Sequence, residues 1–229
     1  MPVIWHSYQW KLGHQMKFLY KGSKKSIGQS NQDYWKDIRN FNPKWRNRAR
    51  LAARMLGSEW ICDIGCGRQD LSRYLQPGAV YLPSDLAAWG PEVMICDLNK
   101  REYPERYLTA ADCAVFLGVF ERIVDMRGVL ADMSVRVEHL CISYSDADRF
   151  KPWPAEWEPG LTRVELIQAI ETAGFTPEQE LLFENKQVIL RARSNRFTAH
   201  DQRAEARRQI VGISVPLSVR FARRINRII

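Results

Sequence analysis

The sequence predicts an α/β fold, a doubly wound sheet that is mostly parallel and has helices on both faces. Short apolar segments alternate with helical segments between residues 45 and 194, as expected for parallel strands buried on both sides. Two glycines follow the first strand. The last two strands are joined by a tight turn, which can connect only antiparallel neighbours. The sheet should therefore contain an antiparallel C-terminal hairpin strand.

The first half of the chain supplies three helices, one of them short, and three strands. The chain has 229 residues, 45% of them hydrophobic, which allows one large domain with extensions. A helix capped by Ser30 is expected from there to Phe41, and a second helix starts at Pro43 and ends near Gly57. Strands are expected at 60–65, 79–86 and 92–99, with a short helix at 68–78.

The second half continues the alternation. A strand at 112–119, a helix at 125–136 and a strand at 138–145 come first. Thr162 and Glu165 form a capping box at the start of the next helix, and Gly174 ends it. Strands at 178–184 and 187–193 then flank a turn at Asn185-Lys186.

The net charge of +8 is unevenly distributed. Residues 1–50 carry +9 and residues 195–229 carry +6, so the part between them carries −7. We divide the chain into a basic aromatic N-terminal arm and helix (1–44), a central domain (45–194) and a basic amphipathic C-terminal extension (195–229). The two basic ends suit an anionic partner such as a membrane surface, a nucleic acid or a phosphorylated substrate, unless they are only solvated tails.

The cysteines and the apolar segments indicate a cytoplasmic protein. Five cysteines without a CxxC pair do not form a disulfide framework or a zinc site, and we expect buried free thiols and no metal. No apolar run approaches the roughly 20 residues that span a bilayer. The segment 216–229 reads as a basic amphipathic helix, which either binds the inner face of a membrane or docks on the core.

The glycine turn after the first strand is unsuited to a pyrophosphate. It reads Asp63-Ile-Gly65-Cys-Gly67, and Asp70 stands where a dinucleotide-binding loop has its third glycine. Carboxylates on both sides of the turn would repel a phosphate and favour a cationic ligand. S-adenosylmethionine (SAM) has a sulfonium, an ammonium and no phosphate.

These motifs together resemble the class I SAM-dependent methyltransferases, which have a Rossmann-like fold. "CDIGCG" resembles the family's first motif, and "YLPSDL", "ICDLN", "GVFERIVD" and "AGF" follow in the family's order over roughly residues 45–194. The resemblance implies SAM as cofactor, S-adenosylhomocysteine (SAH) as product, and cofactor contacts from Asp63, Gly65, Cys66, Gly67, Asp85, Leu86, Asp97, Leu98 and Leu117.

Each contact has an expected role. Gly65 and Gly67 would let the backbone approach the methionine portion, whose ammonium Asp63 would orient. Asp85 can accept two hydrogen bonds from the ribose hydroxyls, and Asp97 would face the adenine. Leu86 and Leu98 would sandwich the adenine or belong to the core.

The candidate catalytic residues are Glu121, Arg122 and Asp146. Many relatives have Glu-His after the fourth strand, but this chain has Glu121-Arg122. Arginine cannot act as a base, although it can hold a phosphate or carboxylate. Glu121 is either a base or a structural partner. The segment 150–160, with Trp153 and Trp157, would form a lid or substrate wall, or simply pack.

The expected activity is O-methylation of a saccharide, glycan or lipid-linked saccharide, resembling bacterial enzymes of polysaccharide assembly. Two alternatives stay open. One is an RNA methyltransferase whose basic N-terminus follows a phosphate backbone, which we consider less favoured. The other is a methyltransferase-like binding module without catalysis.

Overall fold

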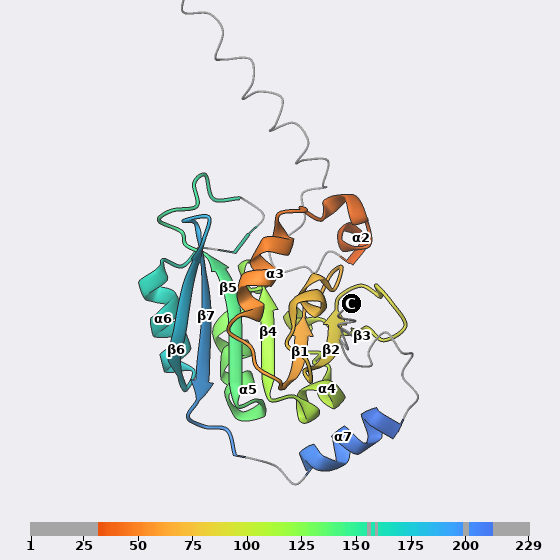
Figure 1. The fold of residues 1–229 in the computed structure, drawn as a ribbon. Helices are drawn as coiled ribbons and strands as arrows, with labels where there is room; N and C mark the ends of the chain where they lie inside the picture. The colour runs from red at the N-terminus through yellow and green to blue at the C-terminus, as the bar shows by residue number, and fades with distance from the viewer. Residues whose placement is uncertain (1–31, 155–156, 159, 199–201, 213–229) are drawn as a thin grey trace, which may run out of the picture.

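A computed structural model describes residues 32–154, 157–158, 160–198 and 202–212 (Figure 1). Its seven strands form one sheet in the order β3-β2-β1-β4-β5-β7-β6. β1 to β5 are parallel, and β7 runs antiparallel to both β5 and β6. The predicted fold class is confirmed. The strands are β1 (Trp60–Ile64), β2 (Val80–Asp85), β3 (Met94–Ile95), β4 (Cys113–Leu117), β5 (His139–Ser145), β6 (Phe175–Phe183) and β7 (Gln187–Ser194).

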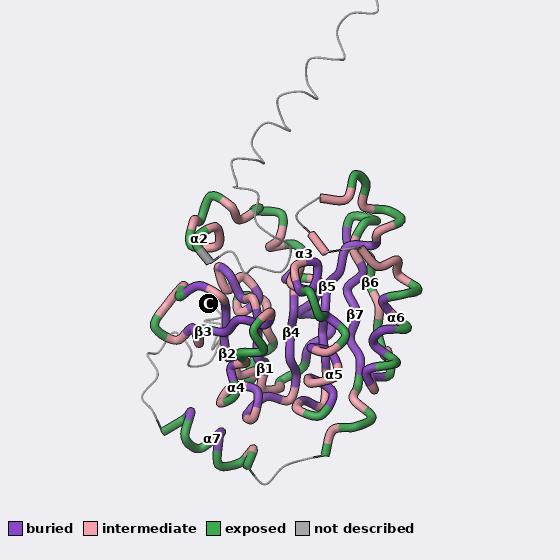
Figure 2. Tube along the Cα trace, turned by 180° about the vertical axis from the view of Figure 1, so that it is seen from behind, coloured by how far each residue is buried: buried purple, intermediate pink, exposed green. Residues whose placement is uncertain are grey.

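Helices cover both faces of this sheet. On one face α5 and α6 pack on buried residues of β4, β5 and β7, and on the other face α3 packs on β1, β4 and β5. The central strands are accordingly buried along their length (Figure 2). The α-helices are α2 (Gln32–Trp35), α3 (Trp45–Ala53), α4 (Glu105–Ala110), α5 (Met126–Arg136), α6 (Arg163–Thr172) and α7 (Gln202–Gly212). The 3-10 helices are η1 (Ile38–Asn40), η2 (Asp70–Tyr74), η3 (Leu98–Lys100) and η4 (Phe120–Arg122).

The first predicted helix is divided in two. The carboxylate of Asp37 accepts a hydrogen bond from the amide of Arg39 at 3.0 Å, so a new 3-10 turn, η1, starts there instead of continuing α2. The predicted helix at 68–78 is the 3-10 helix η2, and it follows Gln69, whose φ is +57°. β3 keeps only two of the eight residues expected for it.

The C-terminal hairpin forms as predicted, with its turn one residue earlier than expected. Glu184 and Asn185 both have positive φ, and the amide of Lys186 bonds to the carbonyl of Phe183 at 3.1 Å. Two consecutive left-handed residues match the twist of the strands they connect. The capping box of α6 is also confirmed, because Thr162 and Glu165 each bond to the other's backbone.

α7, which the sequence pattern did not reveal, packs beside α4 below the sheet (Figure 1). Ala206 and Ile210 are its buried residues. Arg203 and Arg207 both reach Asp112, which precedes β4, at 3.1 and 2.6 Å. α7 therefore docks at the end of the sheet where the parallel strands begin. The predicted helix at 216–229 and the arm at 1–28 lie outside the described residues.

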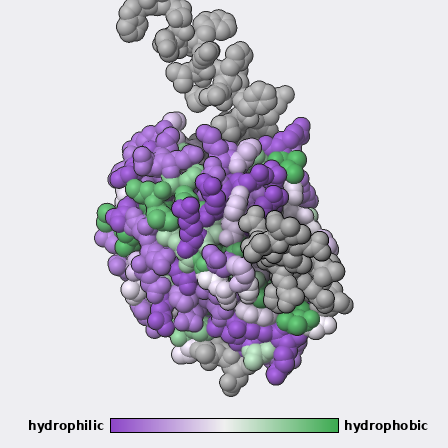
Figure 3. All heavy atoms as spheres, in the orientation of Figure 1, coloured by the Kyte–Doolittle hydropathy of each residue, from purple (hydrophilic) through white to green (hydrophobic). Residues whose placement is uncertain are grey.

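The surface of the described part is mainly polar. Hydrophilic residues dominate the face seen in Figure 3, and an apolar patch lies over the upper ends of β6 and β7. None of the described helices is long and apolar enough to cross a bilayer. All five cysteines are buried and free of disulfides.

Candidate active site

The glycine turn connects β1 to η2 at the end of the sheet formed by the carboxyl ends of the parallel strands. Gly65 and Gly67 have φ of +77° and +48°, a conformation that side chains disfavour. The amides of Gly65 and Cys66 both donate to the carbonyl of Ser84, at 2.8 and 3.0 Å. The turn is thereby fixed to the end of β2.

Packing within the protein also requires the two glycines. A Cβ on Gly65 would lie 2.4 Å from Val119, and one on Gly67 would lie 2.4 Å from Phe41. Protein side chains therefore fill the space of the missing Cβ atoms. Phe41 also makes an edge-to-face contact with Trp89, with ring centroids 4.9 Å apart. The N-terminal segment thus packs directly on the turn.

An acidic side chain lies at the end of each of two neighbouring strands, as predicted. Asp85 ends β2, and Asp97 comes shortly after β3. Asp85 is buried, and its carboxylate accepts from the amides of Gly67 at 2.7 Å and Ala87 at 3.1 Å. Burial raises the pKa of Asp85, although those amides oppose the shift. Asp97 is buried beside Leu98 and accepts from the amide of Asn99 at 3.2 Å. Leu86 is half-buried.

A buried cation of α3 lies close enough to Asp63 and Glu121 to interact with both electrostatically. Arg48 of α3 is 6% exposed, and its Nη2 donates to the carbonyl of Leu117 at 2.8 Å. Its Nε is buried and has no partner among the described residues. Burial lowers the pKa of Arg48 to about 10, while the charges of Glu121 and Asp63 oppose this. No carboxylate of the described residues lies within ion-pair distance of it.

Asp63 in β1 is a buried acid facing that cation. It is 3% exposed, and its carboxylate accepts from the hydroxyl of Tyr81 at 2.6 Å. Burial raises the pKa of Asp63 to about 7, against the opposing effects of Tyr81 and Arg48. Asp63 is therefore held in surroundings that would favour a cationic partner.

Glu121 is oriented by the neighbouring strands β5 and β7. Its Oε1 accepts from both the amide and the hydroxyl of Ser145, at 2.9 Å each. Gln187 donates to that hydroxyl at 3.0 Å and accepts from Arg48 at 3.4 Å. Oε2 of Glu121 is buried and has no partner in the described part of the chain. The chain of donors ends on Glu121, so the orientation of its carboxylate is fixed.

Arg122 projects from η4 to a different group of residues. Its guanidinium carbon lies 4.6 Å from the ring centroid of Trp35 and 5.8 Å from that of Trp157. Arg122 thus connects α2 to the loop after β5.

Asp146 has structural contacts at the end of β5. It is buried, and its Oδ1 accepts from the amides of Asp148 and Arg163 at 3.1 and 3.3 Å. Arg149 lies 3.3 Å from its other oxygen. These contacts fasten the loop between β5 and α6.

The described tryptophans of that loop pack on each other. The rings of Trp153 and Trp157 are 5.2 Å apart, and Phe150 lies 5.2 Å from Trp157. The indole of Trp153 donates to the carbonyl of Glu158 at 3.0 Å. Glu158 in turn donates from its amide to the carbonyl of Glu121 at 2.9 Å. The loop therefore forms a wall beside η4.

Sequence reasoning missed Arg48, Phe41, Ser145 and Gln187. Arg48 could have been found, because it stands one helical turn before Ala52 on the face predicted to point inward. A charge on a buried helix face is a recognisable signal. Among the described residues, no group of three His, Cys, Asp or Glu could hold a metal ion.

Comparison with known proteins rests on structure. No family model and no curated protein matches the chain. The PH0226 protein from Pyrococcus horikoshii OT3 has a TM-score of 0.55 at 12% identity, over 72% of this chain and 100% of that one. A SAM-dependent methyltransferase from Aquifex aeolicus has a TM-score of 0.54 at 14% identity, over 72% and 98%. The chain has the methyltransferase fold.

Other solved structures share this methyltransferase fold. A putative O-methyltransferase from Nostoc punctiforme PCC 73102 has a TM-score of 0.51 at 13% identity, over 71% of this chain. This chain spans only 59% of that protein and 62% of another similar structure. A putative methyltransferase from Haloferax volcanii, solved with the Trm112 activator, has a TM-score of 0.55 at 10% identity, over 71% and 96%. At these identities the likeness concerns the fold.

Proposed function

We propose that this protein is a SAM-dependent methyltransferase. The observation that carries the proposal is the set of incompletely satisfied buried charges beside the glycine turn. Arg48 and Glu121 are both buried, and Nε of one and Oε2 of the other have no partner among the described residues. Buried charges are costly unless they are paired. The carboxylate of a ligand would supply the partner of Arg48, and a hydroxyl-bearing acceptor would supply that of Glu121.

The methionine portion of SAM fits this arrangement. Its carboxylate would bind Arg48, and its ammonium would bind Asp63, whose raised pKa a nearby cation would lower again. When bound, the cofactor supplies an activated methyl group on a sulfonium. Cys66 of the glycine turn and Leu117 at the end of β4 would border the same ligand.

The nucleoside portion would bind along the ends of β2 and β3. The carboxylate of Asp85 accepts from the backbone amides of Gly67, Ala87 and Leu86, and a carboxylate has about four acceptor sites. Asp85 would therefore keep one acceptor site for a ribose hydroxyl. Asp97 and Leu98 would contact the adenine, with Leu86 on the other side.

We propose a hydroxyl group of a saccharide or of a lipid-linked saccharide as the acceptor. Glu121 would accept the hydroxyl proton through Oε2, since Ser145 holds Oε1. Positioning an acceptor in this way can supply roughly 7–11 kcal/mol, and a base a further 10²–10⁴-fold, by general precedent. Arg122 would hold an anionic group of the acceptor. Asp146 would act by fixing the adjacent loop.

Calorimetry with SAM and SAH tests the proposal. The wild-type protein should bind both, and Arg48→Gln should weaken binding about 10- to 100-fold, because a hydrogen bond to a charged group contributes roughly 1.5–3 kcal/mol. Arg50→Gln, at an exposed position of the same helix, is the matched control and should bind like wild type. Absence of SAH binding to wild type would refute the proposal.

A further inference from the structure

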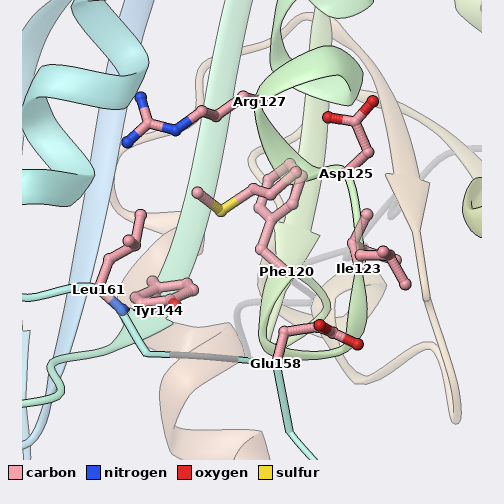
Figure 4. A pocket seen from close by; sticks show the side chains of 9 residues that line it. Phe120, Ile123, Asp125, Arg127, Tyr144, Glu158 and Leu161 are labelled. Carbon is pink, nitrogen blue, oxygen red and sulfur yellow. Dashed lines mark hydrogen bonds between the residues drawn. The ribbon is translucent and has the colours of Figure 1, made fainter. Parts of the chain in front are cut away.

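A pocket of about 260 Å³ lies between η4, the start of α5 and the loop before α6 (Figure 4). None of the residues assigned to the cofactor lines this pocket. Its inner wall is made of Phe120, Ile123, Met126, Tyr144 and Leu161. Ligand pockets for whole drug-sized molecules span roughly 300–1,000 Å³. This pocket is therefore of a size to hold one portion of a ligand.

The inner wall carries no formal charge. Phe120, Ile123, Met126 and Tyr144 are each at most 9% exposed. The only polar side-chain group on this wall is the hydroxyl of Tyr144, which accepts from the amide of Leu161 at 3.0 Å. The interior would therefore favour an apolar group, and a charged group would lose its hydration there without a partner.

The charged lining residues are near the mouth. Asp125 and Arg127 are exposed and Glu158 is half-buried, and Figure 4 shows the Asp125 carboxylate turned away from the aromatic rings. The charged residues thus stay hydrated while the apolar wall lies between them. A ligand that enters would have an apolar end inside and a polar end outside.

Residues that line the pocket are neighbours of Glu121 and of its hydrogen-bond partner Ser145. Phe120 precedes Glu121 in η4, and Glu158 donates from its amide to the carbonyl of Glu121 at 2.9 Å. Tyr144 precedes Ser145 in β5, and Ser145 donates to the Glu121 carboxylate. Neighbouring residues of one strand point to opposite faces of a sheet. The pocket and the Glu121 carboxylate therefore lie on the two sides of the same strand end.

We infer that this pocket binds the uncharged apolar portion, an alkyl chain or aryl ring, of an amphiphilic methyl acceptor. The inference rests on the proposed function and narrows its substrate class. A free polar sugar has no apolar group to place in the pocket. An acceptor that joins a hydroxyl-bearing head to an apolar portion satisfies both the pocket and the polar groups beside it.

Fluorescence binding of N-phenyl-1-naphthylamine, an uncharged apolar probe, tests the inference. Wild-type protein should bind the probe, octyl glucoside below its micellar concentration should displace it, and glucose should not. Met126→Trp and Leu161→Trp, which would fill the pocket from α5 and from the loop before α6, should each weaken probe binding about tenfold or more by removing apolar contact area. Val135→Trp, at an exposed position of α5, should leave it unchanged.

Several results would overturn the inference. Probe binding that is absent, or equal in wild type and both filled variants, would show that the pocket is not an apolar binding site. Displacement by glucose as effective as that by octyl glucoside would reject the amphiphile. SAH calorimetry on the same samples separates the two proposals. SAH binding without probe binding would refute this inference alone, and probe binding without SAH binding would refute the methyltransferase function and the acceptor role together.

Discussion

Replacing Asp63 by Asn should stabilise the cofactor-free protein while weakening its binding to SAM. Asp63 is 3% exposed, and burial raises its pKa from 3.8 to about 7. Between these two pH values the unfolded chain has lost the Asp63 proton and the folded protein still holds it. The free energy of unfolding therefore falls as the pH rises from about 4 to about 7.

The size of the effect follows from the shift. Because one pKa unit corresponds to 1.36 kcal/mol, the raised pKa of Asp63 lowers the free energy of unfolding by about 4 kcal/mol at pH 8 and about 1.5 kcal/mol at pH 5. Asn remains neutral and can still accept the Tyr81 hydroxyl bond. The free energy of unfolding of Asp63→Asn should therefore exceed that of the wild type by up to these amounts. The difference between the two proteins should increase with pH.

Urea unfolding of the cofactor-free protein at pH 5 and pH 8 measures this. Asp148→Asn, at an exposed position, is the control and should show no such pH-dependent gain. SAH affinity of the wild type should also fall as the pH drops below about 7, because protonated Asp63 no longer attracts an ammonium. Our account of Asp63 fails if Asp63→Asn is no more stable than wild type at pH 8, or if its advantage does not increase from pH 5 to pH 8.

Three further substitutions probe other contacts. Gly67→Ala should destabilise the protein by about 1–3 kcal/mol in urea unfolding, through its positive φ and the contact with Phe41; Phe41→Ala in the same chain should recover part of that loss, and full additivity would contradict the contact. Asp112→Asn should cost about 1–3 kcal/mol and increase proteolysis of α7, because Arg207 loses its charged partner; unchanged cleavage would argue against this anchor. Thr162→Ala should cost about 1 kcal/mol by removing the cap of α6, and an unchanged unfolding midpoint would contradict it.

The sheet was predictable because its strands are buried on both faces and their patterns are continuous. The antiparallel last strand followed from one short turn. The missed helices have weak patterns: α4 has six residues, and α7 buries only Ala206 and Ile210. Their positions depend on contacts with distant parts of the chain, such as the bonds from Arg207 to Asp112 and to the carbonyl of Ala110.

The candidate site was predictable where its residues follow strands. Asp63, Asp85 and Asp97 lie at strand ends, so the topology alone brings them to one edge. Gln187 and Ser145 are separated by 42 positions, and only the reversed strand places them side by side. Phe41 reaches the glycine turn from the N-terminal segment, and no local pattern indicates such a contact. The predicted catalytic roles of Glu121, Arg122 and Asp146 stay predictions.

The antiparallel direction of β7 affects the end of the sheet where the parallel strands finish. Because this strand begins at the edge where its parallel neighbours end, its hairpin turn lies beside the loop after β5. There the carbonyl of Lys186 accepts from the amide of Asp146 at 2.9 Å, and its ammonium lies 5.8 Å from the ring centroid of Phe150. The hairpin turn therefore holds the aromatic loop in place through Lys186. A change in the length of the turn would move both Gln187 and that loop.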